Sequence, residues 1–370
     1  MAKIAYIGIK GLPSKGGAER VVEALVQRLK DRHDLTVYCN SRYTPKDTNI
    51  SIVKLIRVPT LAGKHLQPFL LIFLSTLYAL LIGNYDLIHL HNAEACFVAP
   101  ILRLRYRIIA TSHGPAYERQ KWSKIAAALI SAIDYFFVKF PNRLTSVSLP
   151  MADEYRRRWD AEVEYIPNGV EDSLPLDQKG ALDLLHKKGV YDEYILFAAG
   201  RIDRTKGCHT LIEGFLQVET DLKLVVVGDD KVDPQYGSQL KRMAKDDKRI
   251  CFIPFIADKG SLFGIFKKAR VFVFPSEVEA MSMALLEAAS LGVPIICSDI
   301  SSNRAVLHSE QALFFKTGNA RDLKEKLTWA ISNHHEMQNM GLKAKRWVKE
   351  RFSWDKIVEK YDRLYASILK

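Results

Sequence analysis

The sequence predicts an α/β protein made of two doubly wound parallel sheets. Short apolar runs, typical of buried strands, alternate with segments of helical periodicity along nearly the whole chain. A chain of 370 residues is also long enough for two domains that each have a core. We place the first domain at 1–170 and the second at 193–352. A polar linker at 171–192 joins them, and a last helix at 353–370 is expected to pack back toward the first domain.

In the first domain, strands are expected where apolar and β-branched residues cluster without helical spacing. These runs are 3–9, 35–39, 52–58, 85–90, 107–111, 144–147 and 163–166. Between them, apolar residues recur every three or four positions, as in helices that pack one face on a sheet. The helical segments begin near Val22 and continue with 66–83, 93–104, 121–140 and 150–159.

The second domain repeats this alternation. Its strands are expected at 194–199, 222–227, 250–254, 271–274 and 295–297. Its helices, together with the last helix of the chain, are expected near 211–215, 238–244, 261–268, 280–291, 320–333, 336–350 and 354–369. Repeated alternation of this kind predicts a parallel sheet covered by helices.

The charge of the chain is basic and unevenly distributed. The formal net charge is +12, and the first 170 residues hold 23 Lys and Arg against 14 Asp and Glu. Such a surplus favours an acidic partner, such as nucleic acid, an anionic lipid surface or a phosphate-bearing substrate. The five cysteines form no Cys-x-x-Cys pair, so we expect a reducing compartment and neither a disulfide framework nor a zinc site. The chain begins directly with a strand, so no signal peptide is expected.

The segment 66–83 is the most apolar part of the chain and carries no charge. It is near the lower length limit of a membrane-spanning helix, about 17 residues, and Pro68 stands near its start. We expect a buried or interface-lying helix, and contact with a membrane surface stays open. Basic residues surround the neighbouring elements, including Arg103, Arg105 and Arg107. They form either a solvated surface or a site for anionic lipid or a lipid-linked phosphate.

Two glutamates belong to one strand, loop and helix unit of the second domain. Glu279 follows the apolar run 271–274, at the carboxyl end of a strand, where ligands bind in open α/β sheets. Glu287 lies two turns into the helix. Two carboxylates beside an anion-binding helix start suggest hydroxyls held next to phosphates, whereas a helix cap and a solvated side chain are the alternative. The backbone N–H groups of the helix start are those of Ala280, Met281, Ser282 and Met283.

Glycine-containing loops follow a strand in each domain. In the second domain Gly200 opens a loop in which Arg201 and Lys206 can converge on phosphate, with exposed surface charge as the alternative. In the first domain Gly16 and Gly17 precede a helix, where backbone can approach an anion, with a structural turn as the alternative. The spacing is not Gly-x-Gly-x-x-Gly and no acidic residue ends the next strand, which argues against a dinucleotide site.

His113 follows the strand 107–111 and is well placed for a role in an active site. The alternative is a histidine that bonds only to nearby backbone. Both readings stay open at this point.

Taken together, these stretches resemble the retaining nucleotide-sugar glycosyltransferases of family 4, whose GT-B fold has two facing Rossmann-like domains with a cleft between them. The match covers nearly the whole chain, and Lys10-Gly11-Leu12-Pro13 is similar to rhamnosyltransferase-like bacterial members that build surface polysaccharide. Four pieces match in order and spacing: Gly16-Gly17-Ala18-Glu19, Ser112-His113-Gly114, the loop from Gly200 to Gly207, and Glu279 with Glu287.

The resemblance implies a role for each motif of the second domain. Arg201 and Lys206 would neutralise the donor diphosphate as it leaves, which is the stabilisation that the transition state requires. Glu279, with the N–H groups that follow it, would position the donor sugar and its β-phosphate. Glu287 would hold the ribose hydroxyls.

Other implied contacts complete the site. Gly16 and Gly17 would approach the phosphate, and His113 would touch the donor sugar near the reacting carbon. Nucleobase contacts would come from the loop at Pro254 and Phe255. The resemblance implies no metal, because cationic side chains replace it. The leaving phosphate would itself take the acceptor proton, so no separate general base is required.

Some residues depart from the family pattern. Ala280-Met281-Ser282 stand where the family often has Phe-Gly, and the strand ending at Val227 continues with Gly228-Asp229-Asp230 instead of Gly-x-Gly. The stretch from Asp299 to Asn303 lacks a glycine pair. These positions lie at the sugar and base ends of the implied donor pocket, so they leave the donor open more than the reaction.

We therefore expect a hexosyl- or deoxyhexosyltransferase that moves a sugar from a nucleotide-sugar donor to a lipid-linked glycan in cell-surface polysaccharide or lipopolysaccharide biosynthesis. It would be cytoplasmic and peripheral at the inner face of the cell membrane, with the basic first domain facing the anionic lipid. The alternative enzymes are a UDP-sugar 2-epimerase and a sugar phosphorylase. A nucleic-acid-binding module is disfavoured, because the basic residues are not interleaved with aromatics in a nucleic-acid pattern.

Overall fold

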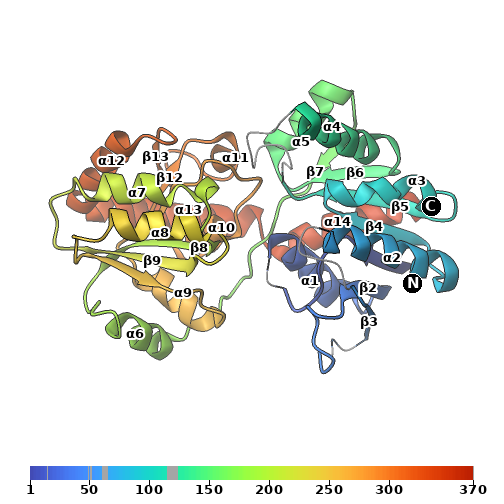
Figure 1. The fold of residues 1–370 in the computed structure, drawn as a ribbon, viewed down its shortest axis with the longest axis horizontal. Coiled ribbons are helices and arrows are strands. Elements are labelled where there is room, and N and C mark those ends of the chain that lie inside the picture. The colour runs from blue at the N-terminus through green and yellow to red at the C-terminus, as the bar shows by residue number, and fades with distance from the viewer. Residues whose placement is uncertain (15, 49, 51, 61–65, 115–123, 370) are drawn as a thin grey trace. The chain divides into compact units, whose positions relative to one another are not determined.

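The structure is a computed structural model and describes all residues except 15, 49, 51, 61–65, 115–123 and 370. The described chain forms two compact units (Figure 1). Unit 1 is Met1–Gly169 together with Trp354–Lys370, and unit 2 is Val170–Ser353. Each unit is an α/β sandwich around one parallel sheet, so the predicted pair of doubly wound domains is confirmed.

Unit 1 contains seven parallel strands in the order β3-β2-β1-β4-β5-β6-β7. They are β1 (Lys3–Ile7), β2 (Asp34–Asn40), β3 (Val53–Val58), β4 (Leu87–His91), β5 (Arg107–Ser112), β6 (Arg143–Ser146) and β7 (Val163–Tyr165). The direction in which strands are added reverses between β1 and β4. Ligands of open α/β sheets bind outside the carboxyl ends of strands at such a reversal.

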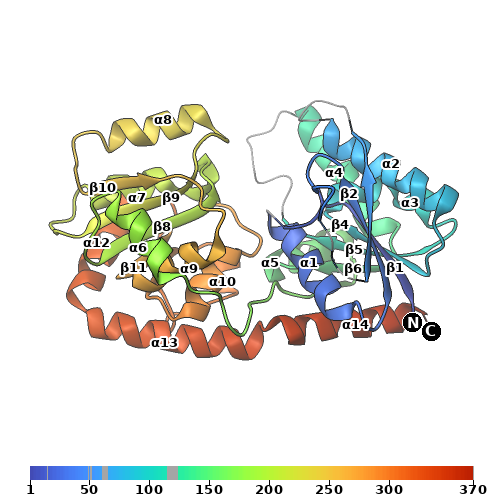
Figure 2. The ribbon, with the colours of Figure 1, turned by 90° about the horizontal axis from the view of Figure 1, so that it is seen from below.

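The helices of unit 1 include one from the far end of the chain. They are α1 (Gly17–Leu29), α2 (Gln67–Ile82), the 3₁₀ helix η1 (Ala93–Val98), α3 (Ala99–Leu102), α4 (Lys124–Lys139), α5 (Leu149–Trp159) and α14 (Trp354–Leu369). Helix α14 lies beside α1 (Figure 2). Arg32 pairs with Asp362 at 2.7 Å, and Arg28 pairs with Asp355 at 2.7 Å. The single helix expected at 93–104 is divided into η1 and α3.

Unit 2 contains six parallel strands in the order β10-β9-β8-β11-β12-β13, with the reversal between β8 and β11. The strands are β8 (Tyr194–Arg201), β9 (Lys223–Asp229), β10 (Ile250–Ile253), β11 (Val271–Phe274), β12 (Ile295–Ser298) and β13 (Leu313–Phe315). The helices are α6 (Gln178–His186), η2 (Arg204–Lys206), α7 (Cys208–Phe215), α8 (Pro234–Met243), α9 (Lys259–Lys268), α10 (Met283–Leu291), α11 (Ser301–Arg304), α12 (Ala320–Ser332) and α13 (His334–Arg351).

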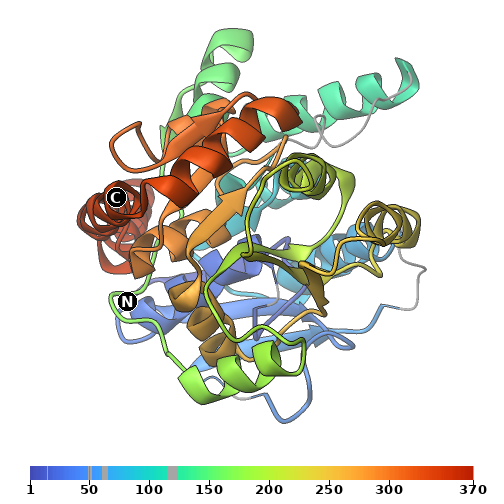
Figure 3. The same cartoon turned by 90° about the vertical axis from the view of Figure 1, so that its left-hand side faces the viewer.

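Helices cover both faces of the unit 2 sheet (Figure 3). Helices α7, α8 and α12 pack together on one face, while α6, α9, α10 and α13 lie on the other. The core under α7, α8 and α12 is apolar and closed to water. Its fully buried side chains include Phe197, Leu211, Phe215, Leu224 and Leu323.

Several elements differ from the prediction. Helix α10 begins at Met283 and not at Ala280, because Ser282 forms the cap and accepts a hydrogen bond from the N–H of Leu285 at 3.4 Å. Strand β13 and helix α11 were not predicted, since three and four residues are too short for a periodic pattern. The polar segment 171–192 contains α6, which packs on α9 within unit 2.

Within the described residues, no helix is both long and apolar enough to cross a membrane. The apolar segment 66–83 forms α2, whose 16 residues lie on unit 1.

Candidate functional site at the strand reversal of each unit

Two loops meet at the strand reversal of unit 2. The N–H of Glu277, after β11, donates to the carbonyl of Thr205, after β8, at 2.8 Å. Gly207 has a φ of 64°, and a Cβ there would lie 2.0 Å from the carbonyl oxygen of Pro275. Only glycine therefore allows the loops to approach so closely. These two loops carry the predicted residues Lys206 and Glu279, while Gly200 and Arg201 are the last two residues of β8, just before the first loop.

Lys206 and Glu279 form an ion pair across the two loops. The Lys206 Nζ lies 2.5 Å from the Glu279 Oε1, and the two side chains are only 19% and 13% exposed. The alternative in which Glu279 caps the helix is wrong, because Ser282 is the cap. The pair fixes an ammonium and a carboxylate at the point of the sheet where ligands bind in this fold.

Glu287 lies in the second turn of α10 and is 6% exposed. Glu287 is the only charged residue of α10, and burying a carboxylate costs free energy unless polar groups surround it. Its neighbours Leu286 and Ala288 are fully buried. The alternative in which Glu287 is a solvated surface residue is therefore wrong.

The start of α10 offers fewer backbone N–H groups to an anion than the sequence analysis predicted. Met283 and Ala284 are the first helical residues, whereas Ala280 and Met281 precede the helix, with side chains 8% and 7% exposed. Ser282 occupies one amide of the first turn. The amides available to an anion at this helix are therefore those of the first two helical residues.

Arg201 is the last residue of β8 and its side chain is exposed. A Cβ at Gly200 would meet no described atom within 4 Å, so packing does not require glycine at this position.

Pro254 and Phe255 follow β10, the edge strand of the sheet, and the Phe255 side chain is 51% exposed. The structure brings Lys206 and Glu279 into contact, whereas β9 and β8 separate Pro254 and Phe255 from β11.

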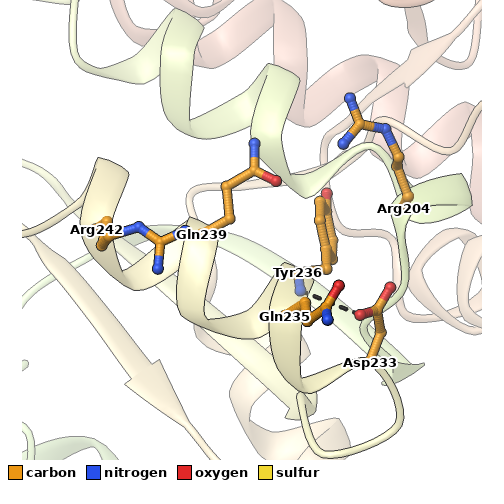
Figure 4. Close-up of a pocket in the computed structure, with 6 residues that line it drawn as sticks. All are labelled: Arg204, Asp233, Gln235, Tyr236, Gln239 and Arg242. Carbon is orange, nitrogen blue, oxygen red and sulfur yellow. Dashed lines mark hydrogen bonds between the residues drawn. The ribbon is translucent and has the colours of Figure 1, made fainter.

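A hollow of about 330 Å³ lies between η2 and helix α8 (Figure 4). None of the sequence-predicted site residues lines it. Tyr236 stands in the hollow and its hydroxyl bonds to Nδ1 of His209 at 2.8 Å, while the other His209 nitrogen lies 3.5 Å from Glu277. Sequence reasoning missed these residues, although an Asp-Pro helix start at 233–234 marks the loop. The lining residues are Arg204, Asp233, Gln235, Tyr236, Gln239 and Arg242.

In unit 1, Gly16 is the cap of α1 and Gly17 is its first residue. Glu19, which is 8% exposed, turns back over the loop and accepts a hydrogen bond from the N–H of Lys10 at 3.2 Å. A Cβ at Gly16 would lie 2.4 Å from the Glu19 carboxylate, whereas a Cβ at Gly17 would meet nothing within 4 Å. A side chain at position 16 would thus require the Glu19 carboxylate to move, whereas no described atom lies in the way of a side chain at position 17.

His113 follows β5 and contacts His91, the last residue of β4. The Nε2 of His113 lies 2.8 Å from the Nδ1 of His91. On the same sheet face, His89 bonds to the hydroxyl of Tyr365 at 2.8 Å and to that of Thr111 at 2.6 Å. Burial lowers the pKa of His113 to about 3 and holds the pKa values of His89 and His91 well below the usual range. All three imidazoles are therefore neutral at pH 7, and the alternative in which His113 bonds only to nearby backbone is wrong.

These low pKa values predict that acid destabilises the protein. Unfolding releases three neutral histidines that bind protons below their unfolded pKa of about 6.5, so the unfolded state binds more protons and stability falls as pH falls. Each histidine contributes about 1.4 kcal/mol per pH unit below that value. We expect urea unfolding to give a lower free energy at pH about 5 than at pH about 7.

Carboxylates also titrate in this range, so a variant isolates the histidine contribution. The free energy of unfolding of His91→Asn should fall less steeply with falling pH than that of the wild type, because unfolding of the variant takes up about one proton fewer. Equal slopes for the two proteins would contradict the buried neutral state of His91.

Family comparisons cover nearly the whole chain. The model described as glycosyl transferases group 1 matches residues 185–347, and the model of glycosyltransferase family 4 matches residues 15–174. The structure of HepE from Anabaena, in complex with UDP and glucose, superimposes with a TM-score of 0.81 at 16% identity, covering 99% of this chain and 100% of that one. The chain is a glycosyltransferase of the GT-B fold.

One relative of this glycosyltransferase is named for capsular polysaccharide biosynthesis. It is 24% identical to the capsular polysaccharide biosynthesis glycosyltransferase CapM of Staphylococcus aureus over 208 residues, which are 55% of this chain and 54% of CapM. The chain thus spans about half the length of that relative. It is also 24% identical to the UDP-Gal:alpha-D-GlcNAc-diphosphoundecaprenol alpha-1,3-galactosyltransferase of Escherichia coli, over 99% of this chain and 97% of that one.

Proposed function

We propose that this glycosyltransferase moves a sugar from a nucleotide-sugar donor to a lipid-linked glycan, with retention of anomeric configuration, during assembly of a cell-surface polysaccharide. The observation that carries the proposal is the Lys206–Glu279 ion pair at the strand reversal of unit 2, together with the buried Glu287 on the helix that follows. A nucleotide-sugar offers a diphosphate to a cation and ribose and sugar hydroxyls to carboxylates.

Each residue has a role in this proposal. Lys206 and Arg201 neutralise the charge that grows on the diphosphate as the sugar leaves. Glu279 holds Lys206 in place and accepts a hydrogen bond from a sugar hydroxyl. Glu287 accepts hydrogen bonds from the ribose hydroxyls. Because a neutral ion pair alone attracts no dianion, the exposed Arg201 and the first amides of α10 supply the net attraction.

Unit 1 supplies further donor contacts in this proposal. Gly16 and Gly17 let backbone approach the phosphate, and His113 contacts the donor sugar. Pro254 and Phe255 contact the nucleobase through an exposed apolar surface. We expect turnover without a divalent cation, because Lys206 and Arg201 meet the diphosphate charge.

The names of the relatives support the proposed donor and acceptor classes. The Escherichia coli relative is named for UDP-Gal and a diphosphoundecaprenol acceptor, and the HepE structure holds UDP and glucose. UDP-hexoses therefore come first in a donor panel, with deoxyhexose nucleotides second.

The test uses the purified full chain with radiolabelled nucleotide sugars and a lipid extract, with and without a chelator of divalent cations. We expect label to enter a glycolipid, with the sugar in the anomeric configuration of the donor when the product is examined by NMR. Inverted product contradicts the retaining mechanism. Isomerisation of the donor without transfer would contradict sugar transfer as the reaction. Release of a sugar phosphate that depends on added phosphate would contradict it as well.

Unit 1 also presents an apolar face to solvent along α2. Phe69, Phe73, Leu77 and Leu81 recur every four residues and are 45%, 45%, 37% and 79% exposed, while small and polar residues of the same helix are buried. Exposed apolar surface of this kind marks an interaction site. The exposed large apolar side chains of the segments 66–82 and 101–104 are here called the α2 face: Leu66, Phe69, Phe73, Leu77, Tyr78, Leu81, Ile82, Ile101 and Leu104.

We propose that the α2 face lies against the anionic inner surface of the cell membrane, where a lipid-linked acceptor is found. Arg103 and Arg105 stand exposed beside Leu104. They donate to the carbonyls of the residues that follow α4 and α2, Phe140 and Gly83, which holds their charges at this surface. The surplus of basic residues in the first 170 positions supports an anionic partner.

Replacing Leu81 with glutamate tests this surface. Because a buried leucine contributes about 1.5–3 kcal/mol, we expect Leu81→Glu to weaken binding to phosphatidylglycerol vesicles by about tenfold or more, as measured by vesicle sedimentation. The matched control is Leu342→Glu, which alters a leucine that is 50% exposed on α13 of unit 2. Equal binding by the wild type and Leu81→Glu would contradict the proposal.

A further inference from the structure

The side chains at the ends of β4 and β5 determine which nitrogen of His113 carries its proton. We propose that His91 positions His113 as a hydrogen-bond donor: His91 donates from Nδ1 to the Nε2 of His113, so the proton of His113 stands on Nδ1. The functional half of this inference, that this N–H contacts an oxygen of the donor, rests on the proposed function. The tautomer itself does not.

The two rings meet edge to edge. Their planes differ by 18°, their centroids are 5.1 Å apart, and the facing nitrogens are 2.8 Å apart. Because the ring centroids are much farther apart than the two facing nitrogens, the hydrogen bond between these nitrogens lies close to the planes of both rings. A hydrogen bond in this geometry requires one proton between the two nitrogens, and each neutral ring has one proton to offer.

The second nitrogen of His91 decides the direction of the bond. His91 is fully buried, and its Nε2 has no hydrogen-bond partner among the described residues. If His113 were the donor, the proton of His91 would stand on that Nε2, as a buried N–H without an acceptor. Leaving a buried donor unsatisfied costs about 1–3 kcal/mol, whereas an unused lone pair costs less. The favoured arrangement therefore places the His91 proton on Nδ1.

Among the described residues, the neighbours of His91 offer it no other partner. His89, whose ring centroid is 4.1 Å away, already bonds through both nitrogens to Tyr365 and Thr111. The backbone is fixed as well: the amide of Asn92 donates to the carbonyl of Thr111 at 2.9 Å, and its side chain donates to the carbonyl of Gly8 at 2.9 Å. His91 is thus held at the end of β4 with one nitrogen directed at His113.

The consequence lies at His113. Its Nε2 accepts from His91, and in the described part of the chain no residue bonds to its Nδ1. The half-buried ring therefore offers a neutral N–H, which selects a ligand oxygen with a free lone pair, such as a sugar hydroxyl or a phosphate oxygen. The opposite tautomer would offer a lone pair, which could accept a hydrogen bond from a sugar hydroxyl but would repel a phosphate oxygen that carries no proton.

The direct test is NMR of the full chain labelled with ¹⁵N-histidine, in which long-range couplings distinguish the two tautomers. His91→Asn and His113→Asn variants assign the signals by their loss. We expect both His91 and His113 to carry the proton on Nδ1. A proton on Nε2 of either ring overturns the inference, and this result needs no enzymatic activity.

Kinetics test the functional half. In His91→Asn the amide N–H stands near the lost Nδ1–H, so the tautomer of His113 and the kcat should be kept within about threefold of the wild type. In His91→Leu no donor remains, and we expect mixed His113 tautomers and a kcat about tenfold lower with donor KM nearly unchanged. If both variants fold and lose kcat equally, His91 has only a structural role. Absence of turnover by the wild type would contradict the proposed function and leave the NMR result standing.

Discussion

Lys206→Ala is expected to lower kcat for sugar transfer by about a thousandfold, the effect of removing a charged group that stabilises the transition state. The loss has two parts. The variant has no ammonium to meet the leaving diphosphate, and Glu279, its partner at 2.5 Å, is left as an uncompensated carboxylate that repels the same diphosphate. Initial rates with the donor selected by the panel measure the change.

A matched lysine provides the control. Lys241 also pairs with a carboxylate, Asp230, but it is 57% exposed and lies on α8. Lys241→Ala should keep kcat within about twofold, because exposed ion pairs contribute little. Turnover by Lys206→Ala at the wild-type rate would show that the ion pair of unit 2 is structural.

Glu287→Gln is expected to raise the dissociation constant of the donor by about a hundredfold. Two hydrogen bonds from ribose hydroxyls to a charged acceptor, each worth about 1.5–3 kcal/mol, would become weaker bonds to a neutral amide. Glutamine keeps the volume of the side chain, so the surrounding buried residues of α10 stay packed. Isothermal titration with the donor measures the constant.

Two controls accompany this variant. Because Glu287 is buried, the thermal unfolding of the Glu287→Gln variant must be compared with that of the wild type. Its binding is interpreted only if the variant is folded. Glu325→Gln changes a glutamate that is 63% exposed on α12 and should leave binding unchanged. Unchanged donor affinity in folded Glu287→Gln would contradict the ribose role.

The fold was predictable because strand and helix periodicities are long and uninterrupted in both halves of the chain. The two loops of the unit 2 site were also predictable, since each follows a strong apolar run at 194–199 or 271–274. The ion pair of Lys206 with Glu279 was not, because only tertiary structure determines which carboxylate a lysine meets across the two loops.

The start of α10 shows why helix boundaries escaped prediction. Ala280 and Met281 are apolar at helical spacing, but they pack as a buried turn before the helix. Ser282 was the signal of the true start, because serine is a preferred cap. Its competitor in the sequence was Glu279, whose carboxylate is bound to Lys206 instead.

Other features depend on the faces that side chains occupy. Helix α2 has apolar residues on every side, so the sequence alone could not show that Phe73 and Leu81 are exposed while Ser75 and Thr76 are buried. His91 and His113, which bond to each other, are 22 residues apart in the sequence. The alternation of His89 and His91 along one strand was a visible signal of a shared face.

The central claim is that Lys206 meets the diphosphate and Glu287 meets the ribose of one bound nucleotide. Calorimetric titration of wild type, Lys206→Ala and Glu287→Gln with the preferred nucleoside diphosphate and with the matching nucleoside tests it most directly. We predict that Lys206→Ala loses the preference of the wild type for the diphosphate and binds the nucleoside as before, whereas Glu287→Gln weakens both ligands. An unchanged preference for the diphosphate in Lys206→Ala, or unchanged nucleoside binding in Glu287→Gln, would contradict the account.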